Sequence, residues 1–214
     1  MTELKILHDA VVAGNMEAMT SLTRKCLDAG YKPGQIINEA LIPAMDVVGN
    51  KFRENEIFVP EVLISAKCMQ TSLDILQPLL TEGEVAKAGK VVIGTVKGDL
   101  HDIGKNLVAI MLEGAGFEVI DLGVDVDAQQ FINKVKEVKP DFVCLSSLLT
   151  TTMPQMGVTI EALHEAGLRQ QVKVMVGGAP VTREFAEQIG ADIYAPDAGA
   201  AVEAAKQAMA KLRQ

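Results

Sequence analysis

Three polar residues able to do chemistry stand close together at Asp99, His101 and Asp102, in a chain with only three histidines. They belong to the stretch GTVKGDLHDIGKN, residues 94–106, which follows a hydrophobic run and precedes an amphipathic one. A carboxylate that accepts one ring N–H of a histidine fixes the tautomer and makes the other nitrogen a better metal ligand. Asp99 and His101 therefore form a candidate for a single oriented ligand to a metal held mainly by something else.

The same stretch lacks the patterns of several other sites. A phosphate cradle needs G-x-G-x-x-G or G-x-x-x-x-G-K-[ST], and neither is present. A phosphoryl-acceptor domain would need an aspartate where the chain has SSL, residues 146–148. A hydrolytic metal centre needs further ligands, and a serine hydrolase needs G-x-S-x-G with a late histidine. One axial histidine suffices when a macrocycle supplies the other ligands. The plainer alternative is a surface histidine at a helix start, with Asp99 as the cap.

The surrounding pattern places this stretch at one edge of a parallel sheet. Short apolar runs predict five strands, at 90–96, 117–123, 141–147, 173–178 and 192–196. Helical patterns follow them near 103–115, 128–138, 153–168, 182–189 and 198–213. Such alternation is typical of an α/β doubly wound domain, here in flavodoxin-like order, which binds ligands at the carboxyl ends of its strands. We expect the loops after the first, third and fourth strands to open onto one crevice.

The first eighty residues instead predict a small helical bundle. Apolar residues recur at helical spacing, and Gly14 and Gly30 stand where helix C-caps are expected. Pro43 either starts a helix or kinks a longer one. The stretch TEGEVAKAGK, residues 81–90, breaks the pattern. We therefore expect a helical cap domain at 1–82, a linker at 83–90 and a Rossmann-like domain at 91–214.

The composition is that of a globular cytoplasmic protein. Hydrophobic residues make up 49% and charged residues 22%, and no apolar run is long enough to span a bilayer. The net charge of −8 disfavours nucleic acid as a partner. Three cysteines without a C-x-x-C pair are expected to be buried thiols in a reducing compartment. The acidic start of the chain does not have the pattern of a signal peptide.

Three motifs in register carry a resemblance. DLHDIG at 99–104 matches the D-x-H-x-x-G motif of cobalamin-binding domains, and SSL at 146–148 and GG at 177–178 match its two companion motifs. The helical front half, with VGNKFRENEIFVPEVLISA at 48–66, resembles the cap domain of the methyl-carrying members. Over essentially its whole length the chain resembles the corrinoid methyl-carrier proteins of anaerobic methyltransferase systems. It is also similar to the cobalamin module of cobalamin-dependent methionine synthase.

The resemblance implies a cobalamin or related cobamide as cofactor, bound base-off with His101 on cobalt. Asp99 would bond to His101, and Thr152 matches the serine that completes this relay in methionine synthase. Gly104 would let the helix begin close to the nucleotide tail, and the glycine pair would admit a flat heterocycle. The implied cofactor-binding set in the sheet domain is Asp99, His101, Asp102, Ile103, Gly104, Ser146, Leu148, Thr150, Thr152, Gly177 and Gly178. From the cap, Phe52, Val59 and Val62 would cover the upper corrin face and shield a methyl–cobalt bond.

The function implied by the resemblance is that of a methyl carrier without catalytic residues of its own. It would take a methyl group onto cobalt from a substrate-specific methyltransferase. A second methyltransferase would then pass the group to tetrahydrofolate or coenzyme M. A reductive activating protein would be a further partner, and nucleic acid and membrane would not. The cap would have to move, with its hinge in the linker. The alternatives are a cobalamin-binding sensor or regulatory module, the small subunit of an adenosylcobalamin mutase, and a flavodoxin-like domain without cobalt.

Overall fold

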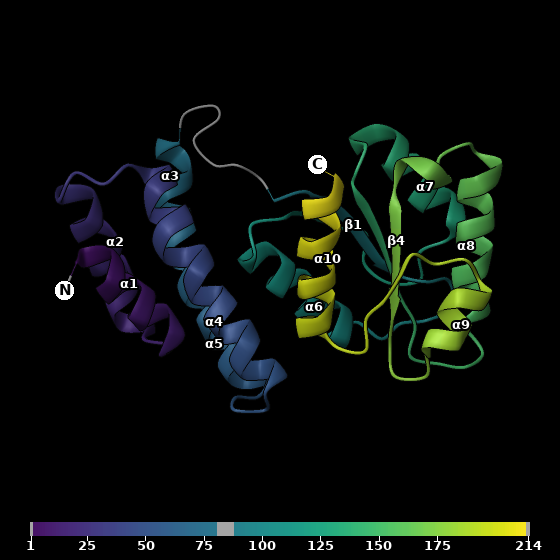
Figure 1. Ribbon diagram of the computed structural model, residues 1–214, viewed down its shortest axis with the longest axis horizontal. Coiled ribbons are helices and arrows are strands. Elements are labelled where there is room, and N and C mark those ends of the chain that lie inside the picture. Colours follow the sequence, from purple (N-terminus) through teal and green to yellow (C-terminus); the bar gives the residue numbers. More distant parts are fainter. Residues whose placement is uncertain (1, 81–87, 213–214) are drawn as a thin grey trace. The chain divides into compact units, whose positions relative to one another are not determined.

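The computed structural model describes residues 2–80 and 88–212, and it divides the chain into two compact units (Figure 1). One unit is formed by the front of the chain up to residue 87 together with residues 114–116. The other is formed by residues 88–113 and 117–214. Most of the linker predicted at 83–90 lies outside the described residues. Each unit is considered by itself.

The helical unit contains the predicted bundle. Its helices are α1 (Glu3–Val12), α2 (Met19–Asp28), α3 (Pro33–Ile36), α4 (Ile42–Arg53) and α5 (Val59–Leu76), with short 3₁₀ helices at Met16–Ala18 and Gln77–Leu79. The backbone has positive φ at Gly14 and Gly30, which follow α1 and α2, as a C-terminal glycine cap requires. A π-helical segment, Ile37–Leu41, leads into α4, and Pro43 is the second residue of α4. The proline therefore stands inside a helical run that continues through a wide turn, where its missing N–H breaks the regular bonding pattern.

One polar pair joins two helices inside this unit. The Thr23 hydroxyl of α2 donates to the Ser72 hydroxyl of α5 over 2.8 Å, and both residues are buried. Around the pair lie apolar side chains that are fully buried, among them Leu7, Val11, Met19, Leu41 and Leu76. Because buried hydroxyls cost free energy unless they are bonded, this pairing fixes how α2 and α5 pack.

The second unit is a five-stranded parallel sheet with helices on both faces. Its strands are β1 (Lys90–Thr95), β2 (Glu118–Asp121), β3 (Phe142–Ser146), β4 (Lys173–Gly177) and β5 (Ile193–Tyr194), in the order β2-β1-β3-β4-β5. The connecting helices are α6 (Ile103–Gly114), α7 (Ala128–Val138), α8 (Pro154–Glu165), α9 (Arg183–Gln188) and α10 (Ala198–Leu212). Helices α6 and α10 cover one face, and α7, α8 and α9 cover the other (Figure 1). The predicted doubly wound sheet with a helical front half is confirmed.

Burial on both faces explains why the central strands could be predicted from apolar runs in the sequence. Strands β1, β3 and β4 are covered on both faces, so nearly all their side chains are buried. On one face, Val92, Leu145 and Val174 pack in a core with Phe131, Ile160 and Ala186 from the helices. The edge strands are shorter than predicted, with β2 four residues long and β5 two. An edge strand has one neighbour only, so its pairing ends sooner.

The strand register brings three loops to one edge. Thr95 at the end of β1 pairs with Ser146 at the end of β3, and Ser146 pairs with Gly177 at the end of β4. The three central strands therefore end at the same level, and the loops that follow them begin side by side. No helix in the described part of the chain is long and apolar enough to cross a membrane.

Candidate functional site

The three loops are bonded to one another at their first residues. The Val96 N–H donates to the Ser146 carbonyl over 3.0 Å, and the Ser147 N–H donates to the Gly177 carbonyl over 3.3 Å. At Gly178, φ is +132°, and a Cβ there would lie 1.9 Å from the Ser147 carbonyl oxygen. Only glycine allows the third and fourth loops to approach this closely.

Asp99 lies at the centre of the three loops and holds His101. The carboxyl group is fully buried, and its Oδ1 accepts from the His101 backbone N–H over 3.1 Å and from Nδ1 over 2.7 Å. The Thr95 hydroxyl donates to the His101 carbonyl over 2.9 Å, which fixes the backbone of the same residue. The histidine side chain is 50% exposed. Since Nδ1 donates to Asp99, the lone pair of Nε2 is on the side of the ring away from the carboxylate, where a metal ligand needs it.

The other oxygen of Asp99 is surrounded by donors from the third loop. Oδ2 accepts from the Leu148 N–H over 2.8 Å and from the Thr152 hydroxyl over 2.7 Å, with longer contacts of 3.3 Å from the Leu149 N–H and the Ser147 hydroxyl. Burial alone would raise the pKa of Asp99. The hydrogen bonds from Thr152, His101 and Leu148 outweigh burial and hold the pKa well below its usual range. The carboxylate is therefore ionised at neutral pH and can only accept.

A fourth segment supports the histidine loop from behind. The Asp125 carboxylate accepts from the Gly98 N–H over 2.7 Å, and the Asp125 N–H donates to the Asp99 carbonyl over 3.0 Å. Both Gly98 and Asp125 have positive φ, of 81° and 54° respectively. These reciprocal bonds tie the loop after β1 to the loop after β2. Sequence reasoning missed Asp125, although an aspartate in a Gly- and Asp-rich turn is the signal that could have indicated it.

The start of α6 presents an open, apolar surface beside His101. Leu100 is 71% exposed and Ile103 is 80% exposed, while Leu148 of the third loop is 43% exposed. Asp102 is exposed and accepts a bond from the Asn106 side chain over 3.1 Å. A Cβ added at Gly104 would meet nothing within 4 Å. Large exposed apolar side chains beside an oriented imidazole nitrogen suit a large, mostly apolar ligand.

The remaining predicted residues of the sheet unit lie at the same edge. Ser146 is half-buried as the last residue of β3, Thr150 is exposed, and Thr152 is buried against Asp99. A Cβ at Gly177 would lie 2.8 Å from the Ala195 carbonyl oxygen. The glycine pair therefore has a packing reason of its own, in the close approach of neighbouring backbone, besides any role toward a ligand.

The three cap residues belong to the helical unit. Phe52 in α4 and Val59 at the start of α5 are half-buried, and Val62 is buried. Phe58, directly before α5, is 64% exposed. Their position over a corrin ring stays a prediction.

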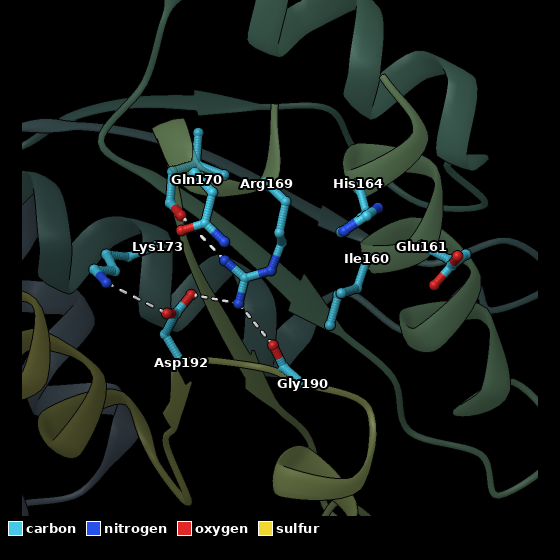
Figure 2. Close-up of a pocket in the computed structure, with 9 residues that line it drawn as sticks. Ile160, Glu161, His164, Arg169, Gln170, Lys173, Gly190 and Asp192 are labelled. Carbon is cyan, nitrogen blue, oxygen red and sulfur yellow. Dashed lines mark hydrogen bonds and ion pairs between the residues drawn. The ribbon is translucent and has the colours of Figure 1, made fainter. Parts of the chain in front are cut away.

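A pocket of about 320 Å³ lies at the opposite edge of the sheet, near the amino ends of β4 and β5 (Figure 2). Its centre is Arg169, whose guanidinium Nη2 donates to the Gly190 carbonyl over 2.6 Å and lies 2.8 Å from the Asp192 carboxylate. Lys173 contacts the same carboxylate at 3.4 Å. The Asp192 carboxylate is shared by both cations, and these bonds join the turn before β4 to the turn before β5. The pocket is thus best explained as a structural ion-pair cluster.

The donor set of the described residues fits one kind of metal group. Within residues 2–80 and 88–212, no three His, Cys, Asp or Glu side chains are grouped so that they could hold a metal ion. The histidine site offers one oriented nitrogen, flanked by apolar side chains and by loops that close on one another. That set suits a metal whose equatorial ligands come with a macrocycle, as in a corrinoid.

Comparison with known proteins agrees with this donor set. A family model of the B12 binding domain matches residues 89–206, and a second model of a B12 binding domain matches residues 4–77. The chain belongs to the family of B12-binding corrinoid proteins, and its cofactor is a corrinoid.

Individual relatives place the chain within that family. It is 44% identical over 203 residues to trimethylamine corrinoid protein 2 of Methanosarcina acetivorans, covering 94% of each chain. It is 43% identical over 208 residues to dimethylamine corrinoid protein 1 of the same organism, covering 97% of each. Among solved structures, the methanol:cobalamin methyltransferase complex of Methanosarcina barkeri matches with a TM-score of 0.89 and 29% identity, covering 97% of this chain and 80% of that one.

Proposed function

We propose that this protein carries a methyl group on the cobalt of its corrinoid between two methyltransferases, without catalytic residues of its own. The observation that carries the proposal is the state of His101: one ring nitrogen is held by a buried, ionised Asp99, and the ring is half exposed. Such a histidine serves as a fixed axial ligand. The bound corrinoid would supply a cobalt centre able to accept and release a methyl group.

The remaining residues would bind and orient the cofactor. The loops after β1, β3 and β4 would receive the nucleotide tail, with Leu148 and Ser146 on the side of β3 and the glycine pair on the side of β4. Leu100 and Ile103, both exposed, would lie against the apolar part of the ring. Phe52, Val59 and Val62 would cover its upper face and exclude water. Such a cover has to move aside when a partner reaches the cobalt. We propose that residues 83–90 provide the hinge for this movement.

The relatives favour a methylamine as the methyl donor. Two of them are named for trimethylamine and dimethylamine, and both are similar to this chain over nearly its full length. We therefore propose a methylamine methyltransferase as the first partner. A second methyltransferase acting on tetrahydrofolate or coenzyme M would remove the methyl group. A reductive activating protein would restore the cofactor after accidental oxidation.

The first experiment asks whether His101 binds cobalt. The full chain is loaded with hydroxocobalamin, desalted and compared by visible spectroscopy with His101→Ala and with His164→Ala, an exposed histidine on α8. We expect a roughly stoichiometric corrinoid in the wild type and in His164→Ala, and a changed spectrum only in His101→Ala. Identical spectra for all three proteins would contradict axial ligation.

The second experiment asks whether the loaded protein carries methyl groups. The reduced holoprotein is mixed with trimethylamine and a trimethylamine methyltransferase, and methylation is followed by the visible spectrum. Dimethylamine with its own methyltransferase is tested in parallel. Retention of the corrinoid without methylation by either pair would contradict the methylamine assignment. Failure with methanol and its methyltransferase as well would favour the sensor or regulatory module.

A further inference from the structure

Ser147 stands in the same buried network as Asp99, although neither the motifs nor the relatives assign it a role. The residue is fully buried directly after β3. Its hydroxyl lies 2.7 Å from the Thr152 hydroxyl, 3.3 Å from Asp99 Oδ2 and 3.2 Å from the Leu149 carbonyl. A buried serine that bonded only to its own loop would not need to face the carboxylate.

The hydrogens available in this cluster limit how it can be arranged. Each hydroxyl has a single hydrogen to donate. Thr152 is 2.7 Å from Asp99 Oδ2 and 3.0 Å from the Leu149 carbonyl, so it chooses between these two acceptors. If Thr152 donates to Asp99, Ser147 can donate to Thr152 over the other 2.7 Å contact. The two shortest contacts are then both used, in the order Ser147, Thr152, Asp99, His101.

We propose that Ser147 is a positioning residue for the axial histidine, acting through Thr152 and Asp99. A hydroxyl that accepts a hydrogen bond becomes a better donor, so donation by Ser147 strengthens the bond from Thr152 to Asp99. More negative charge is thereby drawn toward Oδ2, and less remains on Oδ1 to attract the Nδ1–H of His101. Ser147 therefore weakens the hydrogen bond between Asp99 and the Nδ1–H of His101. The weaker bond in turn lowers the electron donation of Nε2. The meaning of this for cobalt rests on the proposed function, but the hydrogen-bond link itself does not.

The neighbouring serine provides a matched control. Ser146 is half-buried in β3, and its side chain has no hydrogen bond to Asp99 in the described structure. Replacing either serine by alanine removes the same hydroxyl group one position apart, but only Ser147→Ala removes a member of the network. In Ser147→Ala, the Thr152 hydroxyl no longer accepts a hydrogen bond from Ser147, so it donates less strongly to Asp99 Oδ2 and more of the negative charge remains on Oδ1.

The test uses the imidazole nitrogens of the apoprotein at one fixed pH, by NMR on ¹⁵N-histidine-labelled chain. We expect the Nδ1 signal of His101 and its proton to move downfield in Ser147→Ala, because a more negative Oδ1 strengthens the bond. In Ser146→Ala they should stay at their wild-type positions. Unchanged His101 signals in Ser147→Ala, an upfield movement, or an equal movement in both variants would overturn the proposal.

A second measurement carries the inference to the cofactor. After loading with hydroxocobalamin, the midpoint potential of the cobalt(III)/cobalt(II) couple should become more negative in Ser147→Ala, because a more basic axial ligand stabilises the higher oxidation state. It should stay unchanged in Thr159→Ala, which removes a buried hydroxyl that bonds only to the Gln155 carbonyl of α8. An unchanged midpoint potential in Ser147→Ala would overturn the proposed effect of Ser147 on the axial ligand. If the NMR shift appears but no variant, nor the wild type, retains a corrinoid, the proposed function fails and the hydrogen-bond link stands.

Discussion

Replacement of Asp99 by asparagine is the sharpest perturbation of the site, because it keeps the shape of the side chain and changes its bonding. The carboxylate accepts on both oxygens, from His101 at Oδ1 and from the Leu148 N–H and the Thr152 hydroxyl at Oδ2. An asparagine has one acceptor oxygen. If that oxygen takes the position of Oδ2, its amide group faces His101 and can only donate. Nδ1 must then accept, so the proton moves to Nε2 and blocks the nitrogen that we propose binds cobalt.

The size of the effect on stability follows from the bonds lost. A hydrogen bond to a charged group contributes about 1.5–3 kcal/mol, and asparagine gives up the charge and one of the two accepting positions. The half-exposed His101 can recover part of this loss from water. We therefore expect Asp99→Asn to lower the free energy of unfolding by roughly 2–3 kcal/mol at pH 7.

The pH dependence has a definite sign. Because the pKa of Asp99 is held below the unfolded value of about 3.9, its ionised form stabilises the fold above that pH. The contribution disappears as the pH falls from the unfolded pKa through the folded one. The difference in stability between wild type and Asp99→Asn should thus be constant near neutrality and narrow on acidification below about pH 4.

Three measurements check the reasoning on one set of proteins. Urea unfolding of the apoprotein gives the stability, ¹⁵N NMR gives the tautomer of His101, and the visible spectrum after loading with hydroxocobalamin gives axial ligation. Glu165→Gln, which removes one exposed carboxylate from α8 of the same unit, is the control for charge. An Asp99→Asn protein with wild-type stability, the Nδ1–H tautomer and an unchanged spectrum would refute the role given to Asp99.

Four further outcomes follow from the geometry. Gly178→Ala should cost about 3 kcal/mol or more in urea unfolding, since the new Cβ would overlap the Ser147 carbonyl at a φ of +132°; a neutral variant would mean that the two loops separate freely. Gly104→Ala should stabilise the apoprotein by about 0.5–1 kcal/mol, because its Cβ meets nothing, yet weaken corrinoid retention if the nucleotide tail passes there. Arg169→Gln should cost about 1–2 kcal/mol by the same assay and leave the loaded protein's spectrum unchanged, as it acts at the opposite edge. Cys144, whose pKa burial raises to about 12, should resist iodoacetamide at pH 8 in the native protein and react in urea, and native labelling would contradict its burial.

The fold could be predicted from the sequence where the burial of an element produces a recognisable local pattern of apolar residues. Strands β1, β3 and β4 are covered on both faces, and their apolar runs were found with ends within two residues of those observed. The edge strands were predicted too long, because pairing on one side ends before the local β-pattern does. The turn that carries Pro43 was left open, since a proline signals an interrupted bonding pattern but not whether the helix stops or widens.

Only the residues of the site that belong to a sequence motif could be predicted from the sequence. Asp99 and His101 are two positions apart, so their spacing already suggested the bond that the structure contains. Ser147 lies 48 positions from Asp99, and Asp125 lies 27 positions from Gly98. Their bonds exist only because the loops after β1, β2 and β3 meet at one edge of the sheet. The SSL motif drew attention to Ser146, whereas alternation at the strand end turns Ser147 toward the carboxylate. A motif identifies the family, but which of two adjacent serines enters the network depends on the register.

The arrangement around His101 suits a carrier because it separates two demands on one side chain. A ligand that keeps its cofactor through many transfers must hold one orientation and one tautomer, which requires a buried partner. The same ligand must leave its other nitrogen accessible, which forbids burial of the ring. Here the first demand is met by a fully buried carboxylate with donors on both oxygens, and the second by a ring that is half exposed among apolar side chains. Mobility needed for transfer can then reside in other parts of the protein, while His101, the proposed axial ligand, stays in place on a rigid sheet edge.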